Sequence, residues 1–88
     1  MQESNKLKYD YALLLKVETK GHVSKVGKVI IIDTFKEFDN DLLKICRVIT
    51  ERPAIIGKVI TCETDNVKID FFLVKEGEKY YLVHIRVF

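Results

Sequence analysis

The chain has 88 residues, of which 48% are hydrophobic and 32% are charged, with one proline and four glycines. This composition excludes a disordered or low-complexity chain and predicts one small folded domain with a thin hydrophobic core. The formal net charge of +2 is too small to dictate a nucleic-acid or membrane partner, and no apolar run is long enough to span a bilayer.

Residues 1–8 are polar and are expected to form a disordered tail, which leaves residues 9–88 as a single domain. This tail lacks the apolar stretch of a secretory signal, so we expect a cytoplasmic, intracellular protein. Cys46 and Cys62 stand singly within apolar patterns. We expect them to be buried free thiols rather than a disulfide or a metal pair, and we expect no metal or cofactor.

Residues 9–17 alternate, with apolar side chains at every odd position, and this pattern predicts a strand. A turn follows at residues 19–22, where Gly21 permits a positive φ. Residues 23–33 are rich in β-branched side chains, which favour a returning second strand.

Apolar residues then recur at three- and four-residue steps over residues 35–49, which predicts one stripe of an α-helix. A Thr-x-x-Glu capping box begins at Thr34, and a start capped by Asp39 or Asn40 is the alternative. Pro53 is expected to end the helix because it disfavours the α region in the residue before it.

The last third of the chain, residues 55–88, predicts a three-stranded meander. Turn signals at residues 65–66 and 76–77 separate three segments that alternate in phase. A two-residue loop at the first turn pairs Cys62 with Ile69, and the rest of that strand pair follows from it.

On the second strand pair, we expect Phe71 to lie opposite Val83. The combined register places a nearly continuous apolar set on one sheet face, to which we assign the helix. The expected fold is therefore α+β: a single small domain in the order ββαβββ, with a mainly antiparallel sheet and one helix packed on one face.

The opposite sheet face is half apolar in this register. Its apolar half comprises Val59, Phe72, Val74, Tyr80 and Leu82. One helix covers one face only, so these side chains need a second subunit, a partner protein or the first hairpin as cover. The leading hypothesis is a small non-enzymatic interaction or regulatory module. It would act through this face or an edge strand, as a homodimer or on a protein partner.

The polar half of that face holds the candidates for catalysis. Asp70 and His84 are expected to lie directly opposite each other, with Arg86 nearby. An Asp–His pair can orient an imidazole for acid–base chemistry, and an arginine can hold a phosphate or carboxylate. Opposite charges paired across strands also serve simply to solvate a sheet face, so we assign no catalytic residue.

Residues 67–86, two half-apolar strands around a Lys-Glu-Gly-Glu-Lys turn, resemble the central hairpin of PD-(D/E)xK-type nucleases. In that family an Asp on one strand and a Glu-x-Lys on the next bind a divalent metal and activate water. Asp70 matches the family Asp, whereas the Glu-x-Lys position reads His84-Ile85-Arg86. The resemblance therefore implies a degenerate, inactive relative, and it stands as an alternative hypothesis.

Nucleic-acid binding is the other alternative. The first hairpin carries the basic residues Lys16, Lys20, Lys25 and Lys28 against a single acidic residue. A basic β-ribbon can contact phosphates, but lysines also protect exposed strand edges against aggregation. The loop has no aromatic side chain on which bases would stack, so this hypothesis ranks below protein binding.

Overall fold

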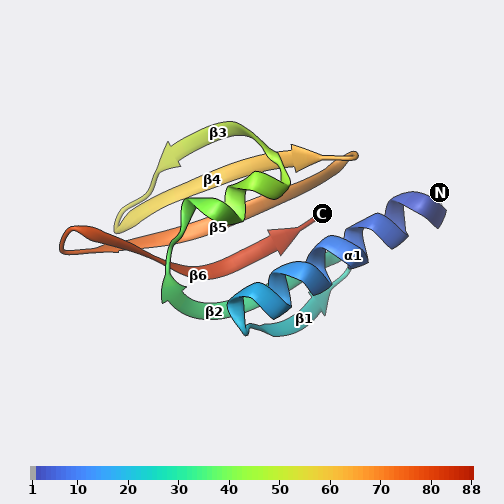
Figure 1. Cartoon of the computed structure of the whole chain (residues 1–88), viewed down its shortest axis with the longest axis horizontal. Helices are drawn as coiled ribbons and strands as arrows, with labels where there is room; N and C mark the ends of the chain where they lie inside the picture. Colours follow the sequence, from blue (N-terminus) through green and yellow to red (C-terminus); the bar gives the residue numbers. More distant parts are fainter. Residues whose placement is uncertain (1) are drawn as a thin grey trace.

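A computed structural model describes residues 2–88 as a single α+β domain (Figure 1). One helix precedes six strands, and a short 3-10 helix interrupts them. The elements are α1 (Gln2–Thr19), β1 (His22–Val26), β2 (Val29–Glu37), η1 (Asn40–Ile45), β3 (Arg47–Pro53), β4 (Gly57–Thr64), β5 (Val67–Glu76) and β6 (Lys79–Val87). The strands form one antiparallel sheet in the order β1-β2-β6-β5-β4-β3.

The predicted α+β class is confirmed, but the predicted order ββαβββ is wrong at the N-terminal end. Residues 9–17, predicted as a strand, lie within α1. Residues 2–8 of the predicted tail form the first turns of the same helix, and Met1 lies outside the described residues. The chain therefore opens with the helix that covers the sheet.

One side of α1 packs on the sheet. Its inward residues recur at three- and four-residue steps, as one face of a helix requires, and they are Leu7, Tyr11, Ala12 and Leu15. The Tyr11 hydroxyl donates a hydrogen bond to Asp65 Oδ2 at 2.7 Å and lies 3.3 Å from Thr64 Oγ1. These contacts join the helix to the β4–β5 turn.

The predicted long helix over residues 35–49 is also wrong. Strand β2 runs through its first part, and only η1 is helical. The alternative cap is confirmed for this short helix, because Asp39 Oδ1 accepts a hydrogen bond from the Asp41 amide at 2.9 Å. The apolar spacing still serves the core, since Leu42 is buried and Ile45 packs against the core.

The β4–β5 pairing matches the sequence-based register at every predicted pair, such as Cys62 with Ile69. Asp65 and Asn66 both take positive φ in the connecting turn. This is the pattern of a type I′ turn, whose twist suits a two-residue hairpin. The turn therefore fixes the register of the strands on either side.

The β5–β6 register differs from the prediction by two residues, because Phe71 pairs with Ile85 rather than Val83. A shift of two keeps the same side chains inward. A β-bulge follows, in which Val83 has no partner on β5 and Leu73 pairs with Leu82. The extra residue inverts the alternation of β6 beyond that point, and Leu82 becomes fully buried.

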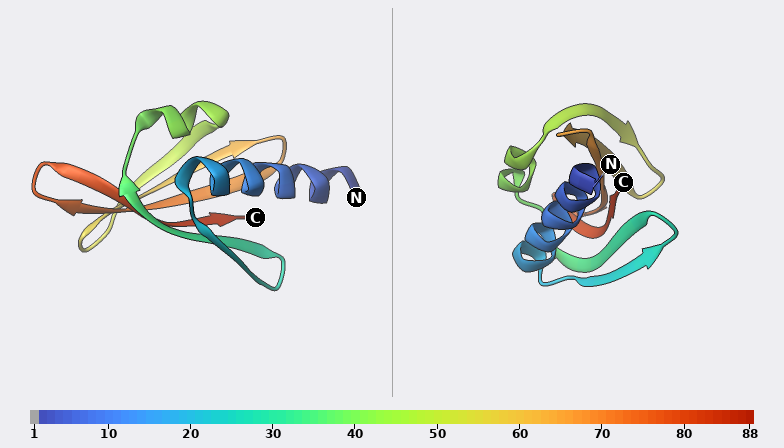
Figure 2. Two further views of the ribbon diagram at one scale, coloured as in Figure 1. Left: turned by 60° about the horizontal axis from the view of Figure 1, so that its bottom comes forward. Right: turned by 90° about the vertical axis from the view of Figure 1, so that its right-hand side faces the viewer.

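Helices α1 and η1 lie on the same face of the sheet, and the sheet curls around α1 (Figure 2). The core lies between these helices and the sheet, and its strand residues are mainly Ile30, Ile32, Ile60, Cys62, Ile69, Phe71, Leu73, Leu82, Ile85 and Val87. No helix of the described residues covers the opposite side, which we call the outer face. Strand pairing and alternation assign to it Val26, Val29, Ile31, Asp33, Phe35, Val59, Thr61, Asp70, Phe72, Val74, Tyr81, His84 and Arg86.

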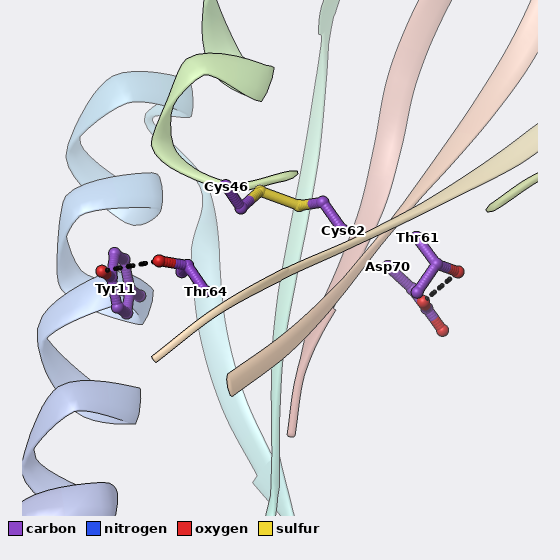
Figure 3. Close-up of a disulfide and its surroundings, with 6 residues drawn as sticks. All are labelled: Tyr11, Cys46, Thr61, Cys62, Thr64 and Asp70. Carbon is purple, nitrogen blue, oxygen red and sulfur yellow. Dashed lines mark hydrogen bonds between the residues drawn. A yellow bond between two sulfur atoms is a disulfide. The ribbon is translucent and has the colours of Figure 1, made fainter. Parts of the chain in front are cut away.

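Cys46 and Cys62 form a disulfide (Figure 3), so the expectation of free thiols is wrong. Cys46 lies directly before β3, and Val48 of β3 pairs with Cys62 of β4. The pairing holds the two Cα atoms 5.6 Å apart, within the span of a disulfide. The sequence reading missed this proximity because it placed Cys46 on a long helix.

Candidate interaction surfaces

The structure separates the predicted Asp70–His84 pair. Asp70 faces Arg86 across the β5–β6 pair, and His84 faces Phe72 instead. The reason is the two-residue difference in register. The predicted direct pairing of Asp70 with His84 is therefore wrong, although both side chains stay on the outer face.

His84 contacts a different carboxylate, that of Asp33 on strand β2. Its Nδ1 lies 2.7 Å from Asp33 Oδ1, and Arg86 Nε donates a hydrogen bond to its Nε2 at 3.4 Å. With Nε2 accepting, Nδ1 carries the proton that is donated to Asp33. Sequence reasoning missed Asp33 because the order of the first hairpin relative to the meander was open.

The carboxyl-bearing residue Asp70 is buried, with an exposed fraction of 8%. Thr61 Oγ1 donates a hydrogen bond to its Oδ1 at 2.7 Å (Figure 3). The Arg86 guanidinium lies over the Phe72 ring, 5.1 Å from its centroid. Thr61, Asp70, Arg86, His84 and Asp33 thus form a polar row across β4, β5, β6 and β2.

The five predicted interface residues divide between the two sheet faces. Val59, Phe72 and Val74 are half-buried on the outer face. Leu82 is in the core, and Tyr80 also turns to the helix side because the bulge at Val83 inverts the strand. The predicted apolar patch is therefore partly wrong.

Two aromatic residues replace them on the outer face. The Phe35 and Tyr81 rings stack in parallel, with centroids 5.2 Å apart, and Phe35 remains 68% exposed. Across the polar row, a second apolar group made by Val26, Val29, Ile31 and Phe88 borders a hollow of about 330 Å³. Apolar side chains therefore flank the polar row on both sides.

The four predicted basic residues are spread along α1, β1 and the connections on either side of β1. Lys16 and Lys25 line a groove of about 560 Å³ between the two elements. Lys28 lies in the β1–β2 turn, and Lys20 directly follows the helix. The Lys25 ammonium donates a hydrogen bond to the Tyr9 hydroxyl at 2.6 Å, and this bond, together with the charge, lowers the pKa of Tyr9.

Comparisons of the chain with protein families, with curated proteins and with solved structures found no match. In the described part of the chain, no three side chains of His, Cys, Asp or Glu gather as the ligands of one metal ion would. Across residues 2–88, no helix has the length and apolar character needed to cross a membrane.

Proposed function

We propose that this chain is a small non-enzymatic interaction module that forms a homodimer through the outer face of its sheet. α1 and η1 occupy the inner face, and no described helix covers the apolar side chains on the other. Bare apolar surface of this kind favours association. The observation that carries the proposal is Phe35, a large aromatic side chain of β2 that is 68% exposed where the pairing with β6 shifts register.

The outer face has the features that an interface between two identical copies needs. A twofold interface must complement itself, so a charged group within it requires the opposite charge in the same patch. The polar row offers the exposed Arg86 guanidinium together with the exposed carboxylate of Asp33. A guanidinium of one copy can then meet a carboxylate of the other, while the flanking apolar groups pack together.

The Cys46–Cys62 disulfide bears on the compartment in which the module works. Disulfides persist in oxidising compartments and are rare in the cytosol. Their chemistry favours an oxidising environment for this chain over the cytoplasmic location that the sequence predicts. Counting free thiols in protein isolated from its native source under alkylating conditions tests this. Two alkylated cysteines would contradict it.

The two other hypotheses have less support. The groove beside Lys16 and Lys25 is lined mainly by apolar side chains, with Tyr9 as its one aromatic residue, so it lacks a series of rings for stacking bases. In the nuclease-like hairpin, His84 stands where the family places its metal-binding Glu, and it contacts Asp33 rather than Asp70.

Substitution of Phe35 tests the proposed dimer. Phe35→Asp places a charge in the interface and is expected to give a folded monomer in size-exclusion chromatography with light scattering. Ile55→Asp is the matched control, since Ile55 is fully exposed in the β3–β4 turn and lies outside the outer face. A Phe35→Asp variant that stays dimeric would sink the proposal.

A further inference from the structure

Strand β1 forms one edge of the sheet and pairs only with β2. Gly27, with φ of +61°, stands first in the two-residue turn that sets Val26 opposite Val29. Such a turn closes on a hydrogen-bonded pair, and bonding alternates along an antiparallel ladder. The backbone N–H and C=O groups of Val23 and Lys25 therefore point away from the sheet.

The side chains of the same two residues point toward the helix side. Val23 pairs with Ile32 and Lys25 pairs with Ile30, both of which are core residues. Val23 and Lys25 thus form one wall of the groove of about 560 Å³, and α1 forms the other wall with Tyr9, Leu13 and Lys16. Leu13 is 59% exposed, so the groove is open and apolar.

The charge of the groove has one sign. Lys16 and Lys25 are its charged lining residues, and no acidic side chain of the described residues lines it. Two further lysines lie at its end, where the Lys8 ammonium contacts the Lys28 carbonyl. An apolar groove with cations alone, beside unpaired backbone groups, complements an extended segment that carries carboxylates.

The opposite edge of the sheet is guarded, which sets β1 apart. Strand β3 contains a bulge between Val48 and Thr50 and ends at Pro53. Bulges and proline are devices that prevent a strand from pairing with another chain. β1 has neither. Its one protective residue is Lys25, whose charge disfavours a basic strand and favours an acidic one, so β1 is the edge that is open to an acidic segment.

We propose that β1 binds an extended acidic segment of a partner protein as a seventh strand of the sheet. Its backbone pairs with Val23 and Lys25, as in other cases of strand addition. Its inward side chains alternate between a carboxylate that meets Lys25 or Lys16 and an apolar group that contacts Leu13.

Three other occupants fit the groove less well. A second copy of this chain would bring the same lysines to the groove and repel. A lipid surface offers no partner for the free backbone groups of Val23 and Lys25. A nucleic acid offers no strand backbone to pair with those groups and no apolar side chain to set against Leu13.

Synthetic peptides provide the probe. The first is a fluorescein-labelled nonapeptide whose odd positions alternate between glutamate and valine and whose even positions are threonine, so that one face of the strand carries both groups. The second has lysine in place of glutamate. The third is the glutamate peptide with alternate backbone amides N-methylated to block strand pairing. Fluorescence anisotropy is expected to show the second and third peptides binding at least roughly tenfold more weakly, as the loss of a charged or buried hydrogen bond predicts.

Variants locate the binding site. Lys25→Glu should weaken binding of the glutamate peptide at least roughly tenfold and strengthen binding of the lysine peptide, as a charge reversal requires. Leu13→Asp should also weaken it. Lys68→Glu and Leu14→Asp are the matched controls, because Lys68 is exposed on β5 and Leu14 lies on another side of α1, outside the groove. Both controls should bind like the unmodified chain.

Several results would overturn the inference. They are equal binding of all three peptides, no change in anisotropy up to the solubility limit of the glutamate peptide, or an equal loss in the Lys68→Glu control. A homodimer that dissociates in Lys25→Glu would assign the edge to a second copy and would also overturn it. Because Lys25 is an exposed strand residue, its variant keeps the test valid if Leu13→Asp unfolds.

Discussion

Lys25 changes the acid–base chemistry of a neighbouring tyrosine. Its hydrogen bond to Tyr9, and then its charge, lower the pKa of that phenol from the ordinary value of 10.0. Because the folded state favours tyrosinate, the contribution of the pair to stability is fully present above pH 10.0 and is lost as the pH falls through the lowered pKa.

Removal of the ammonium should therefore raise the pKa of Tyr9 toward its ordinary value. We expect this shift in the Lys25→Met variant. The NMR signal of the labelled Tyr9 ring during an alkaline titration measures the pKa. Lys20→Met is the control and should leave the pKa where it is. A Tyr9 pKa that does not respond to Lys25→Met would show that the two side chains do not interact in solution.

Substitution of Leu82 tests whether β6 contains the bulge at Val83. Because Leu82 is fully buried, Leu82→Ala should lower the free energy of unfolding by ~2–5 kcal/mol. Leu13→Ala makes the same chemical change at an exposed site and should stay within ~0.5 kcal/mol of the unmodified chain. Urea denaturation measures both. Similar losses at the two sites would mean that Leu82 is exposed and that β6 lacks the bulge.

Among the elements, η1 and the following edge strand depend on the disulfide. The bridge links residues 16 positions apart, and closing a loop of about this length stabilises a fold by ~3 kcal/mol. We expect a reductant to lower the free energy of unfolding by that amount in urea titrations. A variant with both cysteines changed to serine should not respond to the reductant. An unchanged midpoint for the reduced native chain would contradict the bridge.

The register of the meander shows how far sequence alone can reach. Asp65 and Asn66 specify a turn whose geometry fixes β4 against β5, so that pairing follows from local chemistry. The bulge at Val83 inserts one residue through packing between strands, and no local residue type signals it. The placement of Leu82 and of His84 depends on that residue, so the candidate polar pair could not be predicted correctly.

The prediction of a strand in the first segment of the chain was wrong for a different reason. Tyr9, Leu13 and Val17 are exposed on α1, and together with inward Tyr11 and Leu15 they imitate the alternation of a strand. The choice between helix and strand depends on tertiary structure, because the sheet requires a helix to cover its apolar face. The groove beside β1 was likewise invisible, because its two walls come from segments that the sequence reading paired as strands.

At the scale of the whole molecule, the two proposed surfaces do not compete. The outer face lies on the side of the sheet away from α1, whereas the groove opens at the β1 edge on the helix side. A dimer through the outer face therefore leaves one groove free on each copy. The module would then present two identical strand-binding edges, which raises the strength of binding to a partner with two acidic segments.

The proposed homodimer is tested most directly by the mass of the particle that the unmodified chain forms in solution. Light scattering over a dilution series measures this mass. The account predicts a particle of twice the 10.3 kDa chain mass that dissociates on dilution, and a monomer at all concentrations for Phe35→Asp. A native chain with the mass of one copy at every concentration would contradict the homodimer and the role given to the outer face.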